Sequence, residues 1–181
     1  MNDLNRWLLV PAILLPAAAS APAFAVQYLG IEQARGVLFP SANQFDSRSI
    51  TLTEPMRSSI EAQSGMRVRN TTLKAWQARL NDKSLGWVIL DEVYGKHEFI
   101  TYAIAIGNDG TVKGVEILDY RETHGSEVQN PKWRVQFTGK KASDPLKLDE
   151  DIKNISGATL SCRHITDGIK RLLVTWEVAL K

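Results

Sequence analysis

The segment between residues 99 and 118 constrains the fold most, because two stretches of strand-like alternation flank a tight turn. In Phe99–Ile106 the large apolar side chains share one face and the smaller ones share the other: Ile100, Tyr102, Ile104 and Ile106 against Thr101, Ala103 and Ala105. Gly107-Asn108-Asp109-Gly110 has the composition of a hairpin turn and leads into Thr111–Leu118. Gly114 interrupts the second alternation, which indicates a bulge or a close backbone approach. The sequence therefore predicts an antiparallel β-hairpin here.

The other patterned segments predict helices before and after this hairpin. Ile31–Leu38 and Met56–Gln63 have short helical patterns, and apolar residues recur every three or four positions from Ile165 to Leu180. The second helix is expected to open at Thr53, with Pro55 in its first turn, and to end at Gly65.

Two more short strands are expected, at Trp87–Leu90 and at Trp133–Phe137. Helices segregated from strands, rather than alternating with them, are typical of an α+β fold. We predict a small antiparallel sheet with helices packed on it and a C-terminal helix at the end of the chain.

The first 25 residues differ from the rest. Trp7–Ala25 contains no charged residue, is rich in Leu and Ala, and closes with Ala23-Phe24-Ala25, which predicts a secretory signal peptide cleaved after Ala25. An uncleaved membrane anchor is the alternative interpretation of this stretch. The predicted organisation is a signal peptide at 1–25, a helical and extended segment at 26–85, and one domain at 86–181.

Charge and cysteine content exclude several classes of function. The 22 Lys and Arg residues are nearly balanced by 20 Asp and Glu residues, so no basic stripe predicts a nucleic-acid partner. One cysteine, Cys162, permits neither an intrachain disulfide nor a cysteine-rich metal site. His97, His124 and His164 lack the spacing of metal ligands, and no glycine-rich nucleotide-phosphate motif is present. Cys162 and His164 lie two residues apart at a helix start, so their side chains are expected to point to different faces. We therefore interpret Cys162 as a small buried residue and not as a nucleophile with His164 as its base.

The segment Asn154-Ile155-Ser156-Gly157-Ala158-Thr159-Leu160-Ser161 directly precedes the C-terminal helix. One interpretation is helix capping, with Ser156 or Thr159 accepting a backbone N–H bond. The other is a binding site: Gly157 and Ala158 remove side-chain bulk, and the amides of a helix start suit a phosphate.

Three sequence segments together resemble the FMN-binding domain family. Ser156-Gly157-Ala158-Thr159 is similar to the attachment motif of flavin domains in the Rnf complex G subunit, in the C subunit of the sodium-pumping NADH:quinone reductase and in free-standing exported flavoproteins. Residues 118–125 resemble the family's segment ending Glu-Thr-Pro-Gly, and residues 133–140 its Trp…Gln-Phe-x-Gly-Lys segment. The likeness extends from about Gly86 to Trp176.

The resemblance implies a covalent cofactor: the FMN phosphate is esterified to Thr159 by a flavin transferase that uses FAD. The predicted FMN-binding residues are the attachment loop with the helix start, and the loop after the hairpin: Ser156, Gly157, Ala158, Thr159 and Leu160, with Glu122, Thr123, His124 and Gly125. Several positions depart from the family pattern, among them Ser126-Glu127 in place of a Leu-Gly pair. Lys153 stands where Asp is usual, and His124 stands where Pro is preferred.

The expected function is that of an exported electron carrier in the periplasm or at the extracytoplasmic face of the membrane, exchanging electrons with membrane-associated or periplasmic redox proteins. No residue pattern predicts a catalytic acid, base or nucleophile. The alternatives from other classes are a flavin-free exported binding module of the same fold and a flavin-dependent reductase.

Overall fold

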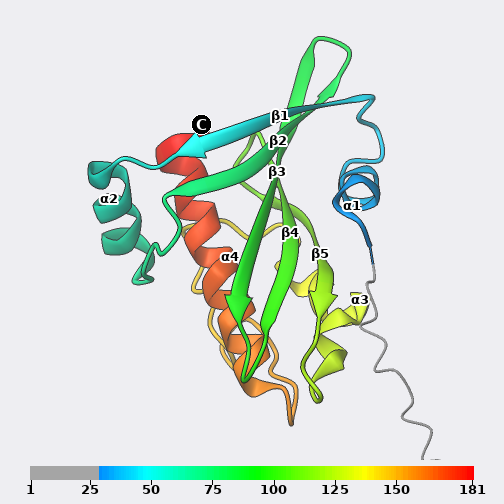
Figure 1. Ribbon diagram of the computed structural model, residues 1–181, viewed down its shortest axis with the longest axis vertical. Helices are drawn as coiled ribbons and strands as arrows, with labels where there is room; N and C mark the ends of the chain where they lie inside the picture. Colours follow the sequence, from blue (N-terminus) through cyan, green and yellow to red (C-terminus); the bar gives the residue numbers. More distant parts are fainter. Residues whose placement is uncertain (1–28) are drawn as a thin grey trace, which may run out of the picture.

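The computed structural model describes residues 29–181, so the predicted signal peptide lies outside the described residues. Five antiparallel strands form one sheet in the order β1-β2-β3-β4-β5 (Figure 1). Their bounds are Gln44–Thr51 (β1), Thr72–Leu80 (β2), Lys83–Tyr94 (β3), Phe99–Gly107 (β4) and Val112–Tyr120 (β5). The α+β prediction is confirmed.

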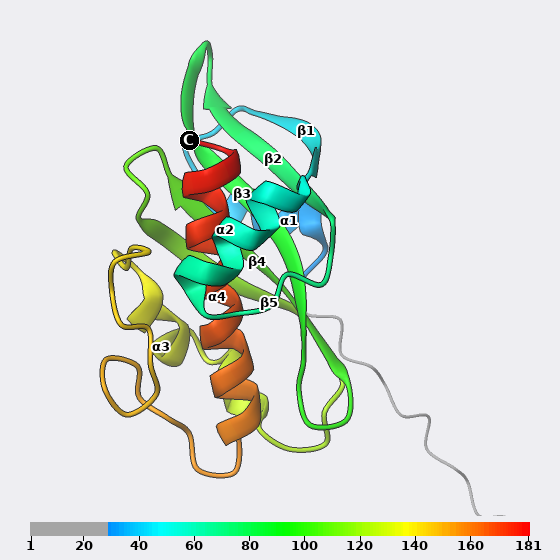
Figure 2. The same ribbon diagram turned by 90° about the vertical axis from the view of Figure 1, so that its left-hand side faces the viewer.

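Helices cover both faces of this sheet. The long helix α4 (Thr159–Ala179) packs on one face beside α2 (Glu54–Ser64), and α1 (Ile31–Leu38) packs on the other (Figures 1 and 2). Short helical turns η1 (Ser126–Gln129), α3 (Pro131–Arg134) and η2 (Val135–Phe137) follow β5. Within the described chain, no helix is long and apolar enough to span a membrane.

The predicted hairpin is the centre of the core. Ile100, Tyr102, Ile104 and Ile106 of β4 pack with the buried face of α4, while Ala103 and Ala105 face α1. The register shifts where Ala105 pairs with Gly114 and Ile106 with Val112, so the β5 strand bulges at the predicted position. A side chain at Gly114 would lie 3.0 Å from Leu38 of α1. The small residues on this face therefore let α1 lie close to the sheet.

Both short helices form as predicted. The second, α2, extends slightly beyond the predicted bounds, begins after Thr53 with Pro55 in its first turn, and ends at Gly65 with a φ of 72°. Glycine is favoured there because other residues resist a positive φ.

The predicted strand at Trp133–Phe137 is wrong, because these residues form α3 and η2. The Asn130 side chain accepts a bond from the Lys132 amide at 2.9 Å, and Pro131 occupies the first helical turn. Trp133 and Phe137 then lie on the same face, with ring centroids 5.2 Å apart in an edge-to-face arrangement. The apolar spacing of this segment is therefore that of a helix turn.

Two strands were not anticipated from the sequence. β1 pairs with β2, and β2 pairs with β3 through a tight turn in which Asn81 has a φ of 53°. The strand expected at Trp87–Leu90 is the middle of the longer β3. The boundary placed between residues 85 and 86 thus falls inside β3, and segments 26–85 and 86–181 share one sheet.

Candidate functional site

Three segments far apart in the sequence enclose a pocket of about 320 Å³ at one end of the sheet. They are the turn between β3 and β4, the loop after β5, and the start of α4, which lie together at the lower end of the molecule in Figure 1. The lining residues are Lys96, His97, Glu122, Thr123, His124, Gly157, Ala158, Thr159, Leu160 and Ser161. This volume lies at the lower end of the range for small-molecule sites.

Most of the predicted site residues meet in this pocket. Glu122, Thr123 and His124 face it from the loop after β5, and the residues from Gly157 to Leu160 face it from the helix start. Gly125 lies beside Ala158, while Ser156 is exposed and does not line the pocket. Lys96, His97 and Ser161 were not among the predicted FMN-binding residues. The strand pattern marks a turn near Lys96 and His97, but only the fold shows that this turn returns to the start of α4.

The start of α4 supplies the donors of the site. The amides of Thr159, Leu160 and Ser161 belong to the first turn, where backbone N–H groups have no partner within the helix and the helix dipole favours negative charge. The residue before the helix is Ala158, so the capping interpretation of Ser156 and Thr159 is wrong. The Thr159 hydroxyl instead accepts a bond from the Asn154 amide group at 3.2 Å.

The backbone explains the small residues of the attachment loop in part. Gly157 has a φ of 85°, a conformation that glycine adopts at little cost, and a side chain there would meet no atom within 4 Å. Open space therefore lies beside Gly157, where a phosphate-bearing ligand would approach the helix start. Ala158 is only 3% exposed, and its small size is explained by the close approach of Gly125.

Tyr120 joins the loop after β5 to α4. Its hydroxyl donates to the His124 carbonyl at 2.5 Å and shares a hydrogen bond with the Ser161 hydroxyl at 3.2 Å. Burial raises the pKa of Tyr120 above its usual value, so the phenol keeps its proton at neutral pH. The two walls of the pocket are thus held together by a neutral hydrogen-bond donor.

The segment at residues 133–140 positions the attachment loop from outside the pocket. The Trp133 indole donates to the Lys153 carbonyl at 2.8 Å, and the Gln136 side-chain oxygen accepts from the Lys153 amide, also at 2.8 Å. Lys140 pairs with Asp151 at 2.8 Å. The Lys153 backbone is therefore fixed just ahead of the attachment loop, while its side chain is exposed.

Cys162 and His164 do not form a catalytic pair. Cys162 is completely buried, and burial raises the pKa of its thiol, as expected for a structural residue. The His164 ring is hydrogen-bonded to the Tyr94 carbonyl. No cluster of three or more His, Cys, Asp or Glu side chains suited to a metal occurs within residues 29–181.

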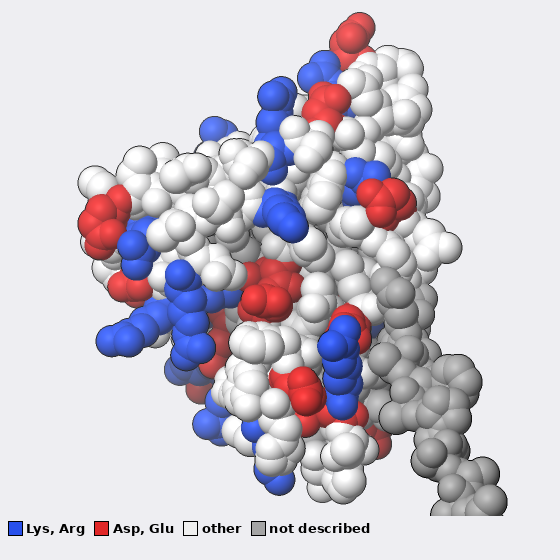
Figure 3. Space-filling view, in the orientation of Figure 1, with Lys and Arg blue, Asp and Glu red and all other residues white. Residues whose placement is uncertain are grey.

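A larger pocket of about 390 Å³ lies beside β3 and the middle of α4. Arg171 at its edge pairs with the buried Asp91 at 2.6 Å, and Asp91 also accepts from the Tyr102 hydroxyl at 2.6 Å. Its remaining charged lining mixes Arg67 and Arg69 with acidic side chains. On the face of the molecule in Figure 3, acidic and basic side chains are likewise interspersed. This mixture gives the larger pocket no preference for a ligand of one charge.

Comparison with known proteins identifies the domain that holds the smaller pocket. Residues 95–174 match the model of the FMN-binding domain. This part of the chain is similar to that family. The matched segment begins at the β3–β4 turn and includes every predicted site residue, which supports FMN as the cofactor.

Curated relatives are subunits of one enzyme complex. The C subunit of the Na(+)-translocating NADH-quinone reductase of Vibrio vulnificus is 32% identical over 90 residues, covering 40% of this chain and 34% of that protein. The same subunit of Pasteurella multocida is 28% identical over 156 residues, covering 75% of this chain and 60% of that protein. The alignments therefore span less than two thirds of either relative.

Solved structures of this subunit share the fold. The crystal structure from Parabacteroides distasonis has a TM-score of 0.51 and 15% identity, covering 75% of this chain and 78% of that chain. NqrC of Shewanella oneidensis has a TM-score of 0.51 and 19% identity, covering 77% of this chain and 70% of that chain. The arrangement of the FMN-binding domain is therefore common to proteins of low sequence identity.

Proposed function

We propose that this protein is an exported electron carrier whose FMN is esterified to Thr159. The observation that carries the proposal is the position of Thr159: this residue lines the pocket at the start of α4, two residues after Gly157, where a side chain would meet no atom within 4 Å. The FMN-binding family and the relatives among NADH-quinone reductase subunits support this proposal.

The residues present suit a bound flavin phosphate. The first-turn amides of α4 favour an anion, and Lys96, His97 and His124 line the same pocket. When bound, FMN supplies reversible one- and two-electron chemistry, which protein side chains lack. The chain's own contribution is to hold the phosphate at the helix start, to surround the ring with Thr123 and His124, and to keep Tyr120 protonated between the two walls.

The attachment reaction needs FAD and a flavin transferase as partner. The Thr159 oxygen attacks the phosphorus of the FMN half of FAD, the phosphoanhydride bond breaks, AMP leaves, and the hydroxyl proton is lost. One phosphoester replaces one phosphoanhydride, so nothing is oxidised or reduced. Outside the cytoplasm a tether of this kind maintains cofactor occupancy, because the effective concentration no longer depends on dissociation.

The test is coexpression of the full chain with a flavin transferase, followed by denaturing electrophoresis and in-gel flavin fluorescence. We expect fluorescence from the wild-type chain, none from Thr159→Ala, and partial retention in Thr159→Ser, because the serine keeps a hydroxyl. Ser156→Ala is the matched control, since Ser156 is exposed and outside the pocket.

Two results would refute covalent attachment at Thr159. Loss of flavin from the denatured wild-type chain would show that FMN, if bound, is not covalent. Fluorescence that persists in Thr159→Ala would move the tether to another hydroxyl. Export is tested separately by N-terminal sequencing of the periplasmic fraction, where we expect the mature chain to begin at Val26. A membrane-bound chain that begins at Met1 would mean an anchor instead.

A further inference from the structure

We propose that Glu122 is a positioning residue, whose carboxylate binds the backbone at the tip of the β3–β4 hairpin and holds that tip as a wall of the flavin pocket. The identity of the ligand rests on the proposed function. The contact between Glu122 and the hairpin concerns the protein alone.

Three consecutive backbone amides converge on one carboxylate oxygen. Oε1 of Glu122 accepts from the His97 amide at 2.6 Å and from the Glu98 amide at 3.1 Å, and the Lys96 amide donates to the same atom. Successive N–H groups arranged in this way form an anion-binding concavity. Here a side chain of the same protein fills it, from a position at least 24 residues further along the chain.

The hairpin tip depends on this contact because the sheet does not reach it. The last pair of the β3–β4 ladder is Tyr94 with Phe99. Beyond that pair, the Gly95 amide donates to the Glu98 carbonyl at 2.8 Å, and the other three amides of the turn donate to Glu122. Gly95 is buried, and a side chain there would collide with the Glu122 carboxylate. Because Gly95 has no side chain, the turn leaves a space that the Glu122 carboxylate fills.

The charge of Glu122 matches this environment. Its burial acts to raise the pKa of the carboxyl, but the three backbone N–H donors outweigh that effect and lower the pKa below its usual value. Glu122 therefore stays ionised at neutral pH, and hydrogen bonds to an ionised acceptor are stronger than neutral ones.

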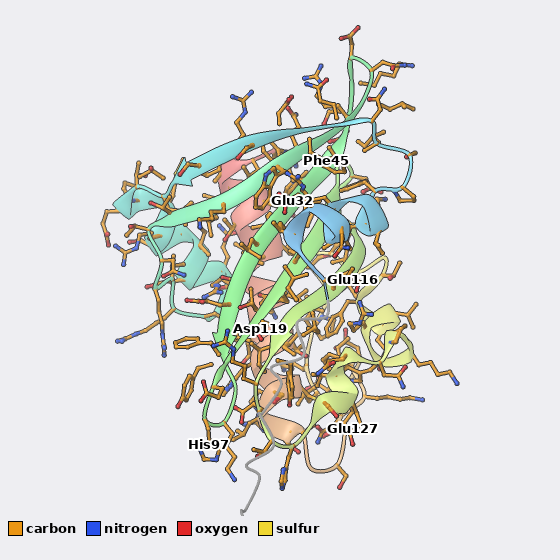
Figure 4. All side chains as sticks on the ribbon, turned by 45° about the vertical axis from the view of Figure 1, so that its right-hand side comes forward. Glu32, Phe45, His97, Glu116, Asp119 and Glu127 are labelled. Atoms are coloured by element: carbon orange, nitrogen blue, oxygen red, sulfur yellow. The ribbon has the colours of Figure 1, made fainter. Side chains whose placement is uncertain are left out.

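The consequence for the pocket is the placement of Lys96 and His97. Both line the pocket together with Thr159, and Figure 4 shows His97 at the tip of the hairpin. The Lys96 ammonium group adds positive charge to the site from a second segment besides α4. Since their backbone amides are two of the three donors to Glu122, releasing this contact releases both side chains from the pocket wall.

The first experiment needs no flavin. Amide hydrogen exchange of the full chain is compared between the wild type, Glu122→Ala, Glu122→Gln and Glu127→Ala. Glu127 is the matched control: it is exposed and lies in η1, at the same end of the molecule (Figure 4). We expect exchange at residues 96–98 to accelerate about tenfold or more in Glu122→Ala and to stay unchanged in Glu127→Ala. Glu122→Gln keeps an acceptor oxygen and should restore most of the protection.

The second experiment uses the flavin-loaded protein and separates positioning from a general structural role. In the wild-type background, Lys96→Ala should shift the flavin midpoint potential, whereas in the Glu122→Ala background the same substitution should shift it by less than half as much. Quenching of flavin fluorescence by iodide should increase in Glu122→Ala, because the wall no longer covers the pocket, and not in Glu127→Ala.

The two experiments fail in different ways. Unchanged exchange at residues 96–98 in Glu122→Ala would overturn the contact between Glu122 and the hairpin. Faster exchange combined with an undiminished effect of Lys96→Ala and unaltered quenching would overturn its role in the pocket. A wild-type chain that holds no flavin would refute the proposed function, while the exchange experiment would still decide whether Glu122 holds the turn.

Discussion

Replacing Gly125 with alanine tests how closely the loop after β5 is packed against the attachment loop. Gly125 has a φ of 84°, and a Cβ there would lie 2.7 Å from the Tyr120 hydroxyl and 2.8 Å from the Ala158 Cβ. Neither neighbour moves easily. Tyr120 is held by the His124 carbonyl and by Ser161, and Ala158 directly precedes α4.

The magnitude follows from two separate costs. A positive φ costs an alanine about 1–2 kcal/mol. Overpacking against neighbours that cannot shift costs about 1–3 kcal/mol more. Gly139 provides the matched control, because it has the same φ of 84° but no atom within 4 Å of its added Cβ. Gly139→Ala should therefore be destabilised only by the positive φ. Gly125→Ala should be destabilised by the positive φ and by overpacking.

The assay is urea unfolding of the flavin-free protein at neutral pH. For a small domain whose unfolding free energy falls by about 2 kcal/mol per molar urea, the midpoint of Gly125→Ala should lie about 0.5–1.5 M below that of Gly139→Ala. Equal midpoints would show that the loop yields to the added methyl group, and would refute the conclusion that Gly125, Tyr120 and Ala158 form a rigid contact. In the flavinylation assay, Gly125→Ala should also attach less flavin than Gly139→Ala.

The remaining predictions concern acid stability and the flavin pocket. Burial acts to raise the pKa of Asp151, but the hydrogen bonds from Lys140 and from two backbone amides lower it below its usual value. The ionised carboxylate therefore stabilises the fold at neutral pH. This stabilisation is lost as the pH falls below about 4, where an aspartate in the unfolded chain takes up a proton. In urea unfolding between pH 3 and 7, the unfolding free energy of Asp151→Asn should fall less steeply with acid than that of the wild type. The exposed Glu150→Gln is the control and should behave like the wild type. An equal acid dependence in Asp151→Asn and the wild type would contradict a stabilising role of the Asp151 carboxylate. His124 lines the pocket, so His124→Pro should change the flavin midpoint potential at a fixed neutral pH, measured by spectroelectrochemistry. Equal potentials in the variant and the wild type would mean that His124 is remote from the flavin.

The elements that the sequence predicted well are those whose causes are local. The Phe99–Leu118 hairpin is specified by a turn of four small or polar residues and by alternation on both sides of it. The helix at Thr159–Ala179 is specified by its apolar period, and the second helix by Thr53 and Gly65 at its ends. In each case the residues that determine the conformation lie within a few positions of one another.

The predictions that were wrong or incomplete depend on distant partners or on competing local signals. Trp133 and Phe137 suit either a strand or a helix turn, and the Asn130 cap decides in favour of the helix. β1 and β2 carry mixed polar patterns, because parts of both lie near the edge of the sheet and remain exposed.

The hairpin and the C-terminal helix could be predicted from the sequence because each is a short-range pattern, and so could the presence of a turn of small residues ahead of that helix. The sequence could not show that the tip of the β3–β4 hairpin meets residues 157–161 and that Glu122 holds this tip in place. Nor could the sequence show that the close approach of Gly125 explains the small size of Ala158. The physical reason is that these contacts join residues far apart in the chain, so they exist only after the sheet has brought its loops to one end.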